Sequence, residues 1–400
     1  MNSTLHTGSG ATDSSVLLPA NSSIEQVIRI EENQLDLLIG VLEEKGFQVV
    51  GPVLRDSAIL FDRIRGSDQL PKGWTDEQTN ATYRLKKGQG RWFGYSSTPA
   101  SWKQFLFPPW LKLFKAERNQ HLIEVRGAEH ESHRYAFLGI HPCDLEAINV
   151  QDKIFIHGGY SDPYYEETRK NLFTVVVACT TPDGTCFCAS MESGPSAAKG
   201  FDLQLTEILS NEDHYFLAEA GSEQGSGLLS RIPHRPASAS ELAEGKAQLN
   251  TATRSMGRSM DTAGLKEQLM GQITDPQWEA IGQRCLACSN CTLVCPTCFC
   301  STVEDMTDLT GANAERVRRW DSCFTGEFSY IHGGSVRSTI HARYRQWLMH
   351  KLSFWVDQFG TFGCVGCGRC ITWCPAGIDL TEEAAKLRQR GQNHESKSTL

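Results

Sequence analysis

The first half of the chain alternates amphipathic stretches with short apolar runs. Between 31 and 46, five apolar residues recur at helical spacing, and Gly46 is a natural helix stop. These residues are Leu35, Leu37, Leu38, Val41 and Leu42. The runs FQVVGPVL (47–54), SAILFDRI (57–64), HLIEVR (121–126), RYAFLGI (134–140) and LFTVVVA (172–178) are typical of strands. This alternation predicts an α/β or α+β N-terminal domain over 24–220.

Two of the predicted strands run directly into cysteines. RYAFLGI leads into His141-Pro142-Cys143-Asp144, where Asp144 is placed to cap the helix DLEAINVQDKIF. LFTVVVA ends on Cys179. Residues that follow strand ends often form sites, so these positions are candidates for chemistry.

The rest of the chain divides by composition. Residues 1–23 are rich in Ser, Thr, Gly and Asn and are predicted to be a disordered lead. Residues 221–262 are rich in Ser, Gly and Ala, which predicts a connector with one helix. A second, α-rich domain is expected over 263–385, with a helical insertion at 301–360 and a tail at 386–400.

The insertion is aromatic and basic. RVRRW (316–320) and HARYRQWLMHKLSFWVDQFG (341–360) have helical spacing. Between 311 and 351 there are seven Lys or Arg against three acids. A solvated helix face, or compensation of the negative charge of nearby clusters, is favoured over docking of an acidic partner.

Composition limits the classes of function. The chain has 400 residues, and its net charge of −8 argues against a dedicated nucleic-acid binder. No run approaches the roughly 20 apolar residues of a membrane span. The first residues resemble neither a secretory nor a mitochondrial leader. Fifteen cysteines then indicate a reducing, cytoplasmic setting in which thiols bind metals rather than form disulfides.

Two cysteine runs carry the chemistry. CLACSNCTLVCP (285–296) and CVGCGRCITWCP (364–375) both read C-x2-C-x2-C-x3-C-P, the pattern of dicluster ferredoxins. In that pattern the fourth cysteine binds the other run's cluster. The sequence therefore predicts two [4Fe–4S] clusters, with zinc or free thiols as the weaker alternative. The expected ligands are Cys285, Cys288, Cys291 and Cys374 for cluster 1, and Cys364, Cys367, Cys370 and Cys295 for cluster 2.

Seven further cysteines fall outside these sets. They are Cys298, Cys300 and Cys323 in the second domain, and Cys143, Cys179, Cys186 and Cys188 in the first. Cysteine is often a buried small hydrophobe, which is the favoured interpretation for each of them. A third iron–sulfur or metal site from the four N-terminal cysteines is the alternative.

Familiar nucleotide motifs are missing. No G-x-G-x-x-G follows a predicted strand, and no G-x-x-x-x-G-K-[ST] phosphate loop occurs. The chain therefore reads as a relay between redox centres, with substrate chemistry on a partner.

Several segments together resemble a known family. CLACSNCTLVCPTCFC, RRWDSCF, FGCVGCGRCITWCP and GIHPCDLEAI are similar to the iron–sulfur β subunits of cytoplasmic nickel–iron sulfhydrogenases. They are equally similar to the iron–sulfur subunits of anaerobic sulfite reductases, which are part of the same dicluster family. The resemblance covers about 130–380, and His141 departs from it where the family has Arg.

The resemblance implies an electron-transfer subunit rather than a catalytic one. Its implied partners are a flavoprotein that binds FAD and NAD(P), and either nickel–iron hydrogenase subunits or a sirohaem sulfite reductase subunit. Three alternatives remain. One is a subunit of the heterodisulfide-reductase or glycolate-oxidase type, although the usual Cys-Cys-Gly motif is missing. Another is an independent oxidoreductase with a substrate site near Cys143 and Cys179. The third is a non-redox module with structural clusters.

Overall fold

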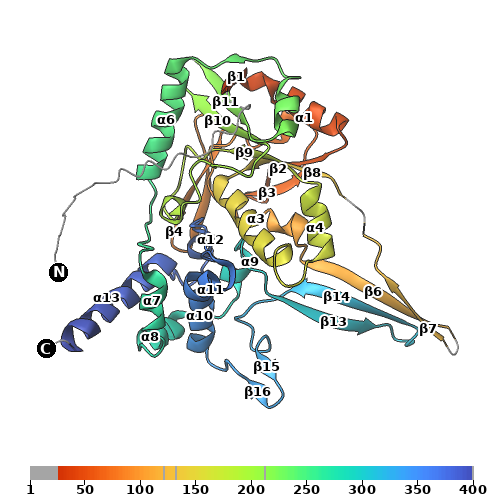
Figure 1. Ribbon diagram of the computed structural model, residues 1–400, viewed down its shortest axis with the longest axis vertical. Coiled ribbons are helices and arrows are strands. Elements are labelled where there is room, and N and C mark those ends of the chain that lie inside the picture. The colour runs from red at the N-terminus through yellow and green to blue at the C-terminus, as the bar shows by residue number, and fades with distance from the viewer. Residues whose placement is uncertain (1–25, 120–121, 131–132, 211–212, 399–400) are drawn as a thin grey trace, which may run out of the picture.

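A computed structural model describes residues 26–119, 122–130, 133–210 and 213–398 (Figure 1). The predicted disordered lead at 1–23 lies outside the described residues. Within the described part of the chain, no helix is long and apolar enough to cross a membrane.

The N-terminal half is built on an eight-stranded mixed sheet, in the order β12-β1-β11-β10-β9-β8-β2-β3. Its strands are β1 (Ile28–Glu31), β2 (Gln48–Arg55), β3 (Ala58–Arg63), β8 (Tyr135–Ile140), β9 (Phe173–Val177), β10 (Leu203–Leu209), β11 (His214–Ala220) and β12 (Arg235–Pro236). The central strands β10, β9, β8 and β2 run parallel, and the outer pairs are antiparallel. The mixed α/β class and the strands predicted at 47–64, 134–140 and 172–178 are confirmed.

Helices cover both faces of this sheet, as parallel strands require. They are α1 (Leu35–Glu44), α2 (Lys103–Leu106), α3 (Pro142–Phe155), α4 (Pro163–Lys170), α5 (Glu223–Leu229) and α6 (Ala239–Arg254). Neighbouring residues of β8 face opposite ways, so Leu138 packs with α1 and α5 and Phe137 packs with α3 and α4. Short 3₁₀ turns occur at Glu32–Gln34, Ser67–Gln69 and Cys188–Met191.

Three details of the predicted elements are wrong. Leu37 lies 40% exposed, on the outer side of α1, although the helix itself is confirmed. Asp144 does not cap α3, because the helix begins at Pro142 after the N-cap His141 and the Asp144 side chain points into an ion pair instead. The stretch 221–262 contains two helices rather than one, and β12 within it joins the sheet.

A second sheet projects away from the body of the molecule (Figure 1). Its strands β6 (Trp110–Asn119), β7 (Leu122–Gly127), β13 (Ser301–Thr307) and β14 (Asn313–Trp320) lie in the order β13-β14-β6-β7. RVRRW lies in β14, so the helix predicted for it is wrong, and the insertion predicted to be helical at 301–360 is helical only from Ile340 onward. Here β6 and β13 flank β14 on either side, and cross-strand pairs such as Arg316–Asp305 stabilise it. Two hairpins are smaller: β4 (Trp74–Thr79) with β5 (Thr82–Lys87), and β15 (Tyr330–Ile331) with β16 (Gly334–Ser335).

The C-terminal part is mainly helical. Its helices are α7 (Leu265–Met270), α8 (Gln277–Arg284), α9 (Asn290–Leu293), α10 (Ile340–Met349), α11 (Trp355–Phe359), α12 (Arg369–Thr372) and α13 (Leu380–Ser398). The helical spacing predicted at 341–360 is confirmed, with one π-helical turn at His350–Phe354 between α10 and α11. A core around Trp278, Phe324 and Trp347 packs directly against the cysteine runs.

Candidate iron–sulfur centres

The two cysteine runs fold into loops with matching backbone conformations. In the first run Ala287 and Ser289 have φ of 51° and 70°, and in the second Gly366 and Gly368 have φ of 64° and 75°. These residues occupy equivalent positions, directly before and after the second cysteine of each run. Left-handed residues at both positions turn each loop back on itself. The repeat in the sequence is therefore also a repeat of backbone conformation.

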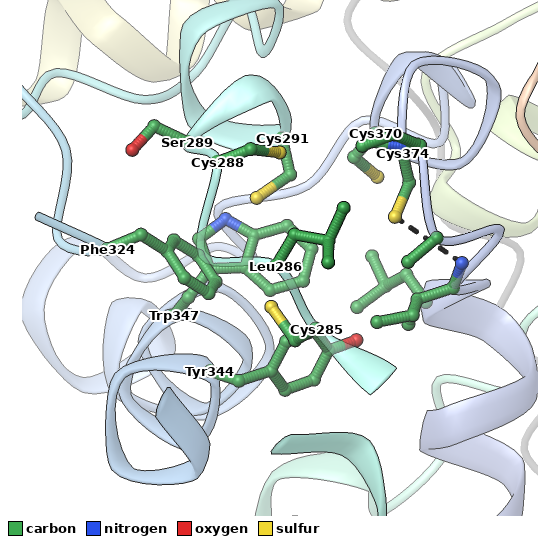
Figure 2. Close-up of a pocket in the computed structure, with 14 residues that line it drawn as sticks. Cys285, Leu286, Cys288, Ser289, Cys291, Phe324, Tyr344, Trp347, Cys370 and Cys374 are labelled. Carbon is green, nitrogen blue, oxygen red and sulfur yellow. Dashed lines mark hydrogen bonds between the residues drawn. The ribbon is translucent and has the colours of Figure 1, made fainter. Parts of the chain in front are cut away.

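Five cysteines line one cavity beside α8, α9 and α12 (Figure 2). They are Cys285, Cys288, Cys291 and Cys374, the set expected for cluster 1, together with Cys370. Phe324, Tyr344 and Trp347 form an aromatic wall on one side of the cavity. Backbone amides approach two of the sulfurs, from Ala287 N to Cys285 Sγ and from Ile378 N to Cys374 Sγ, both at 3.4 Å. The second run thus contributes Cys370 and Cys374 to the lining of this cavity, and the assignment of Cys374 to cluster 1 stays a prediction.

The set expected for cluster 2 gathers around Cys370. Burial raises the pKa of the Cys370 thiol well above its usual value, and the charges of Cys364, Cys367 and Cys295 raise it further. Gly366 N donates to Cys364 Sγ at 3.5 Å, as Ala287 N does in the first loop. Cys295 comes from the first run, as the predicted exchange of fourth cysteines requires.

A buried lysine contacts this second set. Lys351 is 3% exposed, and its Nζ donates to Cys295 Sγ at 3.1 Å, to Thr297 Oγ1 at 3.1 Å and to Gly363 O at 3.0 Å. The π-helical turn carries this side chain into the core, which is a common use of such turns at functional sites. Burial alone lowers the pKa of Lys351. The negative charges of the nearby cysteine thiolates outweigh this effect and hold the pKa well above its usual value.

A second lysine lies close by. Lys103 Nζ donates to the carbonyls of Cys295 at 3.1 Å and Cys298 at 3.0 Å. Two buried cations beside one cysteine set compensate negative charge. The basic residues of the insertion thus differ in role. Lys351 lies where it compensates the negative charge of a cluster. Arg316 and Arg319 instead form ion pairs with acidic residues across the second sheet.

The remaining cysteines of the second domain form thiol pairs. A hydrogen bond from Cys298 lowers the pKa of Cys295 well below its usual value. Cys300 and Cys323 form a similar pair, in which the pKa of Cys300 is lowered to about 7. The four N-terminal cysteines lie together elsewhere, at the edge of the main sheet.

The two main sets fit [4Fe–4S] clusters better than single ions. Within the described residues, no three His, Cys, Asp or Glu side chains are arranged to hold one metal ion. A cubane spreads its four thiolates more widely than a tetrahedral zinc does, so sulfurs placed around a cavity suit it. The eight cysteines expected to hold the clusters stay a prediction from the sequence. Lys351 and Lys103 were missed, because a lysine within a helical pattern gives no sign of burial.

Comparisons with known proteins agree with this geometry. Residues 284–378 match the family model of the 4Fe-4S dicluster domain. The chain is 31% identical over 351 residues to the sulfhydrogenase 2 subunit beta of Pyrococcus furiosus, which covers 87% of this chain and 94% of that protein. No solved structure matches the chain. The resemblance inferred from the cysteine runs is confirmed.

Proposed function

The chain belongs to the sulfhydrogenase beta subunit family, and we propose that it is the electron-transfer subunit of a multisubunit oxidoreductase. One observation carries the proposal: the two sets of cysteines adjoin. Cys370 belongs to the second set and yet borders the cavity enclosed by the first. When bound, the two clusters supply one-electron transfer, and neighbouring sites suit a relay.

The protein's own residues prepare these sites. Phe324, Tyr344 and Trp347 exclude water from one side of the first cavity. Lys351 and Lys103 place positive charge beside the second. At the same cavity Cys288 is exposed and Leu286 is 66% exposed. Electrons exchanged with a partner would pass through the surface at these two exposed residues.

The expected partners follow from the family. We propose a flavoprotein that binds FAD and NAD(P) at one end, and hydrogenase catalytic subunits at the other. The identity to a sulfhydrogenase subunit favours the hydrogenase over a sirohaem sulfite reductase subunit. We propose the cytoplasm as the location, because cysteine runs that bind metal rather than form disulfides suit a reducing compartment.

Spectroscopy and co-purification test the proposal. The full chain, purified without oxygen and reduced with dithionite, should give low-temperature EPR signals of two interacting [4Fe–4S]¹⁺ clusters. Affinity purification from the native host should bring down a flavoprotein together with a nickel–iron pair. A chain without cluster signals would contradict the electron-transfer role. Co-purification with a sirohaem protein would instead select the sulfite reductase.

A further inference from the structure

A second cavity opens where two parallel strands end. Cys143 follows β8 and Cys179 follows β9, and these strands are direct neighbours in the sheet. Because parallel neighbours end at the same edge, both thiols lie at the carboxyl end of the sheet, where α/β proteins usually bind ligands. Cys186 and Cys188 reach the same place on the loop that follows Cys179.

This loop is fastened to the second cysteine run. Phe187 N donates to Gly366 O at 2.8 Å, and Ser193 Oγ donates to Val365 O at 2.6 Å. A Cβ at Gly366 would lie 2.6 Å from the Phe187 carbonyl, so only glycine allows this approach. The loop that carries Cys186 and Cys188 is therefore held directly against the loop that carries Cys367.

The cavity is lined by sulfur. Cys143, Cys179, Cys186 and Cys188 all border it. Burial raises the pKa of each thiol, and each is also affected by the charge of another member of the four. The four thiols thus form one connected group, and none of them is in a disulfide.

One observation opposes the view that these cysteines only fill a core. His141 borders the cavity with its Nε2 buried and without a hydrogen-bond partner, and the side chain is 5% exposed. Buried polar groups are nearly always hydrogen-bonded, so this nitrogen calls for an explanation such as a bound ion or group.

We propose that Cys143, Cys179, Cys186 and Cys188 bind a third [4Fe–4S] cluster. Soft thiolates in fours are the usual ligands of such clusters, and here too no single-ion arrangement exists among the described residues. Free His141 Nε2 is then placed to hydrogen-bond with the bound group.

The third site lies next to the second. Cys367 is an expected ligand of cluster 2 and also borders the new cavity, just as Cys370 borders the cavity of cluster 1. The three sites therefore follow one another, with the second in the middle. This extends the series of one-electron sites from the dicluster domain into the N-terminal domain. The inference goes beyond the proposed function and needs only that the chain acquires iron–sulfur clusters.

Iron counting on the full chain tests the inference without any mutation. The anaerobically purified or reconstituted chain should hold about twelve irons and twelve acid-labile sulfides, because each cubane carries four of each. Native mass spectrometry under anaerobic conditions should show the corresponding mass. A fully loaded chain with about eight irons would overturn the proposal.

A paired substitution places the extra irons. Cys186→Ala with Cys188→Ala removes two ligands of the new site from one loop and should lower the count from about twelve to about eight. Cys323→Ala, a cysteine paired with Cys300 outside the cavity, is the matched control and should keep about twelve. ⁵⁷Fe Mössbauer spectra should show that the paired variant loses one cubane and retains two.

The outcomes separate this inference from the proposed function. A paired variant that still holds about twelve irons would overturn the third site. Zinc, or about two irons, bound in place of the third cubane would overturn it as well. Two clusters without a third would leave the electron-transfer role intact, whereas a chain that takes up no cluster at all would contradict both.

Discussion

The guanidinium of Arg369 makes two hydrogen bonds of 2.8 Å to the carboxylate of Asp144, and the two side chains are only 1% and 2% exposed. Arg369 Nε also donates to Thr98 O at 2.8 Å. Arg369 precedes Cys370 of the second cysteine set, and Asp144 follows Cys143 of the N-terminal cavity. This bidentate pair therefore joins the two domains between their cysteine sites.

Arg369→Met should destabilise the protein strongly. It leaves the Asp144 carboxylate buried without its partner, which typically costs about 3–5 kcal/mol of the free energy of unfolding. Asp144→Leu should cost a similar amount, because it leaves the Arg369 charge unpaired. The double variant should recover much of the loss, since a buried ion pair replaced by apolar groups is often neutral. Melting temperatures of the three variants measure this, and additive losses in the double variant would contradict it.

Cys374→Ala should remove cluster 1, although Cys374 lies in the second run. Its Sγ borders the cavity formed by Cys285, Cys288 and Cys291. The EPR and Mössbauer signals lost in Cys374→Ala should thus match those lost in Cys285→Ala. Cys367→Ala is the matched control from the same run and should lose a different set of signals. If Cys374→Ala instead matched Cys367→Ala, the exchange of fourth ligands would be refuted.

Local patterns predicted much of this molecule. Strands at 47–64, 134–140 and 172–178, helix α1 and the helices at 341–360 follow from apolar periodicity, because each buries its own side chains. The eight cysteines of the two runs follow from spacing alone, and the structure places Cys370 and Cys374 of the second run at the same cavity as Cys285, Cys288 and Cys291 of the first.

The failures are long-range. Asp144 has the position of a helix cap, but Arg369 lies 225 residues further on and competes for its carboxylate. RVRRW has helical spacing, yet strand β6, some two hundred residues earlier in the chain, pairs with it. Lys351 looks like any lysine in an amphipathic helix until the π-helical turn places it beside Cys295. In each case a partner distant in sequence decides the outcome.

Lys351→Met should make the reduction potential of one cluster more negative. The Lys351 ammonium donates to Cys295 Sγ at 3.1 Å, and a positive charge favours the reduced, more negative state. A hydrogen bond to a charged group contributes about 1.5–3 kcal/mol, and only the part that differs between the oxidised and reduced cluster shifts the potential. At 59 mV per tenfold change for one electron, the expected shift is on the order of tens of millivolts, with an upper bound of about 130 mV. An EPR-monitored redox titration measures it.

Lys266→Met is the control for that experiment. The Lys266 side chain forms an ion pair with Asp357, whose side chain is 60% exposed, and not with a cysteine. It should leave all potentials unchanged, because exposed charges are screened by solvent. A Lys351→Met potential that stays at the wild-type value, or rises, would contradict the role assigned to this lysine.

Asp76→Asn should change the pH dependence of stability. Burial raises the pKa of Asp76 from 3.8 to about 6, and the charge of Asp183 adds to the effect, while hydrogen bonds from Gln78 and Ser96 oppose it. Because the folded pKa is higher, the folded state keeps a proton that the unfolded chain releases. The wild-type free energy of unfolding therefore falls as the pH rises through this window, by about 3 kcal/mol in total.

The Asn variant carries no such proton, so its stability relative to wild type should rise by about 1 kcal/mol between pH 5 and 7 and level off above pH 7. Lost or altered hydrogen bonds to Ser96 and Gln78 add an offset that does not depend on pH, so the slope alone tests the prediction. Melting temperatures of both proteins across this range measure it. Parallel curves would mean that Asp76 is ionised at pH 5 in the folded protein, and that its neighbours outweigh its burial.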